Sequence, residues 1–143
     1  MFQGEFSNNM DDKGRVSIPA AFRDVLKNCH AEGQLIITRT PHYPCLVAYP
    51  KREWNRLLKR ISATQPSDGL RAYKHIVISS AQEYAPDRQG RVLLSPALRD
   101  YASLSRNVQF AGDGEIFEIW DKDSWGKQFE ADLELAKSFE LSL

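Results

Sequence analysis

Three stretches of the chain place hydrophobic residues at helical spacing. Residues 51–61, about 70–81 and 122 to about 139 repeat apolar side chains every three or four positions, with polar residues between them. This pattern predicts amphipathic helices that bury one face and leave the other in solvent. The apolar stripes are Trp54, Leu57, Leu58 and Ile61 in the first, Leu70, Tyr73, Ile76 and Val77 in the second, and Trp125, Phe129, Leu133 and Ala136 in the third.

Shorter apolar or alternating runs predict strands in the rest of the chain. Two short helices are expected at 20–26 and 96–101, because each has a proline at its start, where the first helical turn accepts one. The segment Gly112-Asp113-Gly114 predicts a hairpin turn between the last two strands. The expected strands cover residues 2–8, 15–18, 34–38, 45–49, 82–85, 91–94, 107–111 and 116–120.

A fourteen-residue pattern occurs twice. Residues 11–24 and 87–100 agree at seven of fourteen positions, where unrelated segments of ordinary composition would share about one. Around each copy the predicted elements follow the same order: ββαββ and then a helix. We infer a tandem duplication and expect an α+β fold with a short-stranded barrel. The expected divisions are 1–62 for the first repeat and its trailing helix, 63–81 for a linker and helix, and 82–143 for the second repeat and the C-terminal helix.

Length and composition suit a cytosolic globular protein. The 143 residues are 42% hydrophobic, enough for a core. No apolar run reaches the roughly 20 residues of a membrane span, and the first residues lack the basic and apolar segments of a signal peptide. The two cysteines, Cys29 and Cys45, lack a C-x-x-C spacing and suit reduced thiols.

Charge is balanced overall but uneven along the chain. The zero net charge argues against indiscriminate nucleic-acid binding, although it permits a local basic patch. Residues 51–74 contain seven basic residues against two acidic ones, whereas residues 113–143 contain nine acidic residues against three lysines. A head-to-tail contact between neighbouring copies would pair the basic helix 51–60 with the acidic segment 121–140 and, if it closes, form a ring. The alternative is that both helices only cover their own barrel. The candidate interface residues are Trp54, Arg56, Lys59 and Trp125.

Each copy of the repeated pattern begins with an Asp-x-x-Gly-Arg turn. Asp11 and Asp87 can accept backbone N–H groups of their own turns. Gly14 and Gly90 can adopt the positive φ that a tight connection needs. We expect these four residues to shape the turns.

The arginine that follows each glycine is the main candidate for a DNA contact. Arg15 can place two hydrogen bonds on a guanine or on a phosphate, and Arg91 has the same option. The alternative is an intramolecular ion pair, for Arg15 with Asp11 or across the pseudo-two-fold with Asp87. The neighbouring cations, candidates for phosphate contacts, are Lys13 and Arg88.

No motif indicates an active site or a bound cofactor. The sequence lacks the nucleophile elbow, the P-loop, the zinc-protease helix and the dinucleotide fingerprint. Cys29, His30, His42 and Cys45 match no zinc-site spacing. We therefore expect no enzyme activity, no cofactor and no metal.

Motifs along nearly the whole chain resemble those of the MraZ family. This resemblance implies a swapped-hairpin (AbrB-like) fold with pseudo-two-fold symmetry, in a bacterial, cytoplasmic and nucleoid-associated regulator. It implies binding to double-stranded DNA upstream of the division and cell-wall gene cluster, including the protein's own promoter, by ring-shaped, octamer-like homo-oligomers. It also favours DNA over an ion pair for Arg15. The motifs are Met1-Phe2-x-Gly4, the Asp-x-x-x-Arg pair at 11–15 and 87–91, residues 13–19, Pro44-Cys45-Leu46, Tyr49-Pro50-x-x-x-Trp54 and Phe117-Glu118-Ile119-Trp120-Asp121-x-x-x-Trp125.

One departure from the repeat concerns the turns themselves. The second copy has Arg88-Gln89 where the first has Asp12-Lys13, so the two turns need not contact DNA equally.

Two classes of function follow from the sequence. The first is a sequence-specific DNA-binding regulator, favoured by the cations in both turns. The second is an oligomeric scaffold or interaction module without DNA binding, which the zero net charge leaves open. A neutral protomer should bind one site weakly, so we expect several protomers to engage tandem direct repeats about 10 bp apart. No membrane and no small-molecule substrate is expected.

Overall fold

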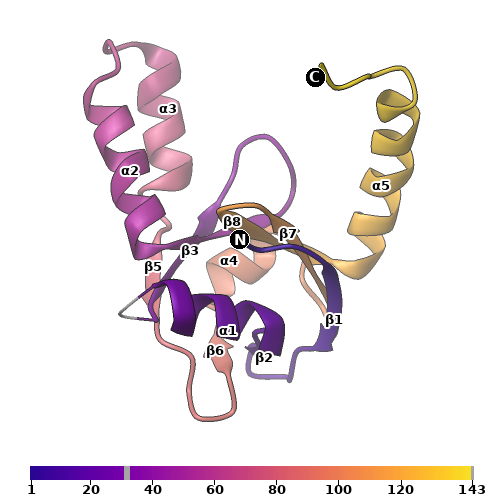
Figure 1. Cartoon of the computed structure of the whole chain (residues 1–143). Coiled ribbons are helices and arrows are strands. Elements are labelled where there is room, and N and C mark those ends of the chain that lie inside the picture. Colours follow the sequence, from indigo (N-terminus) through magenta and orange to yellow (C-terminus); the bar gives the residue numbers. More distant parts are fainter. Residues whose placement is uncertain (31–32, 143) are drawn as a thin grey trace.

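The structure of the chain, a computed structural model, describes residues 1–30 and 33–142 (Figure 1). Over these residues the chain forms five helices and eight strands, an α+β arrangement in which the named strands pair antiparallel. Within the described part of the chain, no helix combines the length and the apolar character needed to cross a bilayer. The helices are α1 (Ala20–Cys29), α2 (Lys51–Ser62), α3 (Asp68–Val77), α4 (Pro96–Tyr101) and α5 (Lys122–Ala136).

Six strands form one sheet, and two form a separate ribbon. The sheet order is β1-β7-β8-β4-β3-β5, and the ribbon consists of β2 and β6. Their bounds are β1 (Glu5–Asn9), β2 (Arg15–Ser17), β3 (Leu35–Arg39), β4 (Leu46–Pro50), β5 (Gln82–Tyr84), β6 (Arg91–Leu93), β7 (Asn107–Asp113) and β8 (Ile116–Asp121).

Strand pairing mixes the two halves of the chain. β1 pairs with β7 and β5 pairs with β3, so the first strand of each half lies beside a strand of the other half. Corresponding strands also meet, because β4 pairs with β8 and β2 pairs with β6. In the ribbon, Val16 lies opposite Val92, which is its equivalent in the repeated pattern. The two halves therefore share one sheet and one ribbon.

The main core lies between the sheet and the short helices α1 and α4. Phe22 of α1 and Leu98 of α4 are buried there, and the central valines of both ribbon strands belong to the same cluster. The rings of Phe2, Phe22 and Phe117 pack in edge-on or tilted contacts with centres 4.7 to 5.4 Å apart. The inner face of the ribbon is thus fixed to the core, and its outer face is free for other contacts.

Helices α2 and α3 form a hairpin beside β3 and β5 (Figure 1). Trp54, Val77 and Ile36 are buried in a second cluster between this hairpin and the sheet. Trp54 packs edge-on against Tyr49, with ring centres 5.5 Å apart. The predicted stripe of α2 therefore forms the core of the helical hairpin.

The predicted helix over about 70–81 ends early, at Val77. The carbonyl groups of Ile76 and Val77 accept hydrogen bonds from the hydroxyls of Ser80 and Thr38. These side-chain donors satisfy carbonyls at the end of the helix, and the chain turns toward β5.

The hairpin turn predicted at residues 112–114 is displaced. Asp113 pairs with Ile116, so the connection between β7 and β8 is the two-residue loop Gly114-Glu115. Gly114 has a φ of +81°, which suits glycine at the first position of such a loop. Gly112 instead lies within β7, where the backbone of Phe2 and Gln3 crosses it. A Cβ on Gly112 would lie 2.6 Å from the backbone atoms of both residues.

Helix α5 departs most from its sequence pattern. The predicted helix to about residue 139 ends at Ala136. No residue of α5, which lies wholly in the described part of the chain, is buried. Phe129 is 47% exposed and Leu133 is 49% exposed. Figure 1 shows the reason, because α5 rises away from the sheet after its first turn. The hydrophobic periodicity predicted the helix correctly. It also predicted a buried apolar face, whereas the described chain leaves that face uncovered.

Candidate nucleic-acid interface

The first repeated turn is built around the carboxylate of Asp11. Its Oδ1 accepts the backbone N–H groups of Lys13 and Arg15 at 3.0 and 2.8 Å. Its Oδ2 accepts Nε of Arg15 at 2.7 Å. The backbone closes the loop, since Asp11 N donates to Arg15 O and Gly14 N donates to Asp11 O. One carboxylate therefore accepts three hydrogen bonds, from Lys13 and Arg15, and so fixes the turn.

The second turn repeats this geometry at every position. Asp87 Oδ1 accepts the N–H groups of Gln89 and Arg91 at 2.8 and 2.9 Å, and Oδ2 accepts Arg91 Nε at 3.1 Å. Gly14 and Gly90 have φ values of +95° and +76°, in the left-handed region. The exchange of Asp12-Lys13 for Arg88-Gln89 leaves the backbone bonds of the turn in place.

Each turn leads directly into one strand of the ribbon. Because side chains alternate along a strand, the central valines point to the core while the flanking residues point outward. Arg15 lies opposite Leu93, and Ser17 lies opposite Arg91. The ribbon thus presents two arginines diagonally on its outer face. Sequence reasoning missed Ser17 and the 57%-exposed Leu93, although strict alternation in a three-residue strand indicates them.

The ion pair expected as the alternative role of Arg15 is present. Arg15 pairs with Asp11, and Arg91 pairs with Asp87. Both ion pairs use the arginine Nε, and the side chain of Arg15 remains 39% exposed. This ion pair is therefore a way of orienting the guanidinium group as well as of closing the turn.

Both aspartates are held in their charged form. The backbone N–H of Arg15 is the largest cause that keeps the pKa of Asp11 below its usual value of 3.8, and the guanidinium of the same residue acts in the same direction. The backbone N–H of Arg91 likewise lowers the pKa of Asp87. Because each carboxylate is negatively charged, it would repel a phosphate. The two aspartates are therefore suited to shaping the turns and not to contacting the DNA backbone.

The two neighbouring cations are exposed. Lys13 and Arg88 lie at the tips of the turns, and no hydrogen bond or ion pair of either side chain is found over residues 1–30 and 33–142. They are in position to meet a polyanion that approaches the ribbon.

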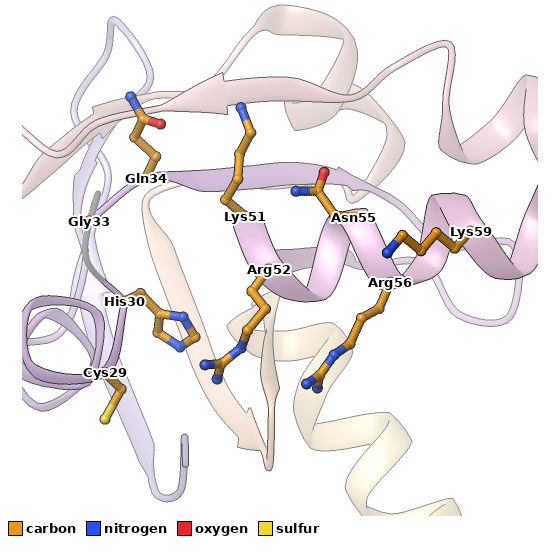
Figure 2. A pocket seen from close by; sticks show the side chains of 9 residues that line it. All are labelled: Cys29, His30, Gly33, Gln34, Lys51, Arg52, Asn55, Arg56 and Lys59. Atoms are coloured by element: carbon orange, nitrogen blue, oxygen red, sulfur yellow. The ribbon is translucent and has the colours of Figure 1, made fainter.

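The basic residues of α2 line a hollow away from the turns. This hollow, of about 560 Å³, lies between the end of α1 and the first half of α2. Figure 2 shows Arg52 and Arg56 extending side by side on the side of His30. Both also pair with Glu53, at 3.4 and 2.9 Å. The hollow is lined by Cys29, His30, Gly33, Gln34, Lys51, Arg52, Asn55, Arg56 and Lys59.

The four candidate interface residues are separated by the structure. Arg56 and Lys59 are exposed on α2, whereas Trp54 is buried beneath the same helix. Trp125 of α5 is half-buried, donates its indole N–H to Glu5 at 3.0 Å and packs against Trp120. Trp54 therefore serves the helical hairpin, and the other three remain accessible.

The cysteines and histidines do not gather. Cys29 is exposed and Cys45 is buried, and burial raises the pKa of the Cys45 thiol. In the described residues, no group of three or more metal-ligating side chains lies together.

Comparison with known proteins decides the family. The family described as "MraZ protein, putative antitoxin-like" matches residues 1–71 and 77–141. The chain belongs to the MraZ family. Proteins named "Transcriptional regulator MraZ" are similar over nearly their full length. That of Shewanella amazonensis is 37% identical over 99% of this chain and 93% of its own length. That of Escherichia coli O127:H6 is 36% identical over 94% and 88%, and that of Shewanella pealeana is 40% identical over 91% and 86%.

The resemblance inferred from the sequence is thereby confirmed. Each of the two ranges matched by the MraZ family contains one Asp-x-x-Gly-Arg turn.

Proposed function

We propose that this MraZ protein is a transcriptional regulator that binds DNA through the outer face of the β2–β6 ribbon and its two turns. The observation that carries the proposal is the duplicated turn, which places an oriented arginine on each strand of one ribbon. A two-stranded ribbon fits the major groove, where arginine forms paired hydrogen bonds with guanine. The names of the relatives support a regulatory role.

The roles within this surface differ by residue. Arg15 and Arg91 contact bases or phosphates, and Lys13 and Arg88 contact phosphates. Asp11, Gly14, Asp87 and Gly90 hold the turns and do not themselves contact DNA. The tips of the turns differ in charge at two positions, where Asp12-Lys13 corresponds to Arg88-Gln89, so the two turns need not contribute equally.

The fold that supports this surface is, in our proposal, a duplicated swapped hairpin of the AbrB-like type with pseudo-two-fold symmetry. The pairing of β1 with β7 and of β5 with β3 supports it, because each half gives its first strand to the other. The pairing of Val16 with its equivalent Val92 supports a pseudo-axis at the centre of the ribbon.

Affinity comes from several protomers acting together. A protomer with zero net charge and a few cations at its ribbon binds one site weakly. A head-to-tail ring, octamer-like in size, would point successive ribbons the same way around the circle. The sites on DNA are then tandem direct repeats about one helical turn apart, roughly 10 bp. We place these repeats upstream of the division and cell-wall gene cluster, including this protein's own promoter. The protein itself would act in the cytoplasm and on the nucleoid.

The contact between neighbours pairs the basic face of α2 with the acidic helix α5. Arg56 and Lys59 are exposed on the first, and Trp125 begins the uncovered stripe of the second. Opposite charge and an open apolar stripe support this pairing. Trp54 contributes only by holding α2 in place from below.

A gel shift on the DNA just upstream of this gene tests the function. We expect a discrete complex that a shuffled duplex of the same composition does not compete away. Among duplexes with one, two or three repeats, affinity should rise steeply with repeat number, and inserting half a helical turn between repeats should weaken binding. Equal binding to the shuffled duplex would contradict sequence-specific recognition, and indifference to repeat number would contradict multivalent binding.

A second function is an oligomeric scaffold or interaction module without DNA binding. The uncovered stripe of α5 favours it, because such a stripe needs a partner whether or not the ribbon binds DNA. Assembly without any complex on the upstream DNA would support this alternative.

A further inference from the structure

The first turn is covered by an arginine from the other half of the chain. Gly14 is buried beneath the side chain of Arg99, which lies on α4. A Cβ on Gly14 would lie 2.7 Å from Arg99 Nε and 2.8 Å from Cζ. The guanidinium group therefore occupies the space directly over this glycine, one residue before Arg15.

The second turn shows the reciprocal arrangement. Gly90 is buried beneath Arg23 of α1, and a Cβ on Gly90 would lie 2.5 Å from Arg23 Nε and 2.6 Å from Cζ. Gly90 directly precedes Arg91. Each short helix thus reaches across the pseudo-two-fold to the turn of the opposite half.

Backbone bonds complete each contact. Leu94 N donates to Gly14 O at 3.0 Å, and Arg99 Nε donates to Leu94 O at 3.1 Å. In the other half, Ile18 N donates to Gly90 O at 2.8 Å, and Arg23 Nε donates to Ile18 O at 3.0 Å. One strand end and one arginine of each half therefore hold the glycine of the opposite turn from two sides.

We propose that Arg99 and Arg23 are positioning residues for DNA binding: Arg99 sets the position of Arg15, and Arg23 sets the position of Arg91. The proposal rests on the proposed function of the ribbon. Contacts of this kind must be held to within about 0.5 Å by their supporting residues. A flat guanidinium can lie on the bare face of a glycine while its Nε–H binds a carbonyl, and a lysine cannot do both.

The contact explains why two glycines with bare faces occur at these positions. The repeat shows that Arg23 and Arg99 recur at equivalent positions, but a single sequence does not show that each side chain reaches the turn of the opposite half. The consequence is that each DNA-contacting turn is a composite of both halves. A change on one helix should act on the turn of the other half.

Amide NMR of the free protein tests whether each arginine acts on the turn of the opposite half. Arg99→Lys keeps the charge, and we expect it to shift the signals of Gly14 and Arg15 while leaving Gly90 in place. Arg23→Lys should do the opposite. Arg71→Lys is the matched control, since Arg71 is 63% exposed on α3 and pairs there with Asp68. In the unaltered protein, an NOE should join the Hα protons of Gly14 to the side chain of Arg99 and none should join them to Arg23, so the placement is testable even if a variant unfolds.

Binding to the upstream DNA supplies the second readout. Arg99→Lys should weaken it by at least about fivefold, as expected for the loss of one guanine contact. If binding weakens while the amide signals of the first turn do not move, Arg99 contacts DNA directly and the proposal is wrong. It is also wrong if Arg99→Lys shifts the turn of its own half. The NMR arm needs no DNA, so shifted turn signals beside normal binding by Arg15→Ala would overturn the proposed function and leave the positioning contact standing.

Discussion

Single carboxylates decide the geometry of this ribbon. Asp11 and Asp87 each bind two backbone N–H groups and one guanidinium Nε, so the turn and the direction of the arginine are set together. The sequence predicted that each aspartate shapes its turn and can pair with its arginine, because Asp-x-x-Gly-Arg is a local pattern whose partners lie within four residues. It also posed DNA contact and ion pairing as alternatives for Arg15. In the structure the ion pair uses Nε and leaves the side chain of Arg15 39% exposed, so the two roles are compatible.

The order of causes behind the lowered pKa of Asp11 gives a prediction. In Arg15→Ala, the backbone N–H of residue 15 remains, and we expect Asp11 still to titrate below 3.8. Since the folded pKa is lowered, the carboxylate stabilises the turn at neutral pH. That contribution is lost as the pH falls below 3.8 and through the folded pKa. Carboxyl ¹³C NMR gives the midpoint, and a value at or above 3.8 in the variant would show that the guanidinium, not the backbone, dominates.

Elements were predicted well where their cause is local, and less well where it is not. Helix α2, which begins at Lys51, and the strands of both halves follow from the spacing of hydrophobic residues. The early end of α3 depends on Thr38, a residue 39 positions from its partner Val77. The exchange of first strands between halves depends on pairings of still longer range, which a single sequence does not display.

The displaced hairpin turn gives a test at the scale of one strand. Gly112→Ala should destabilise the fold by about 1–3 kcal/mol, because its Cβ would collide with the backbone of Phe2 and neither strand can move freely. Gly126→Ala in α5 is the matched control. A Cβ there meets nothing within 4 Å, and replacing a helical glycine by alanine should stabilise by about 0.5–1 kcal/mol. Urea denaturation measures both, and equal effects would contradict the crossing of the N-terminal segment over Gly112.

The whole molecule has two surfaces that a neighbouring copy can reach. The uncovered stripe of α5 and the basic hollow of α2 lie on different helices. Figure 1 shows these two helices apart from each other, and Figure 2 shows the basic side chains of α2 that line the hollow. The sequence indicated the charge asymmetry but could not say which apolar stripe is covered within the chain. The structure divides them: Trp54 is buried in the hairpin, whereas the stripe of Phe129 and Leu133 is exposed.

Charge reversal tests the use of these surfaces for assembly. Light scattering should show a large assembly for the natural sequence. Arg56→Glu together with Lys59→Glu should shift it to smaller species, because the acidic α5 of a neighbour would then be repelled. Arg71→Glu with Lys74→Glu on α3 changes the charge equally and should leave the assembly intact. A strict monomer at micromolar concentration, or equal effects of the two pairs, would exclude the proposed contact.

The most direct test of DNA binding through the ribbon is a fluorescence anisotropy titration of Arg15→Ala on the DNA upstream of this gene, with circular dichroism as a check on the fold. Each lost guanine contact should cost about 1–3 kcal/mol, and several protomers on one duplex multiply the effect. We therefore predict that Arg15→Ala folds but loses specific binding. Arg91→Ala should also weaken binding, by an amount that need not equal that of Arg15→Ala, and Arg71→Ala should leave binding unchanged. Loss of the fold in Arg15→Ala would favour the ion pair as its main role. Binding by a folded Arg15→Ala that equals that of the natural sequence would contradict the account.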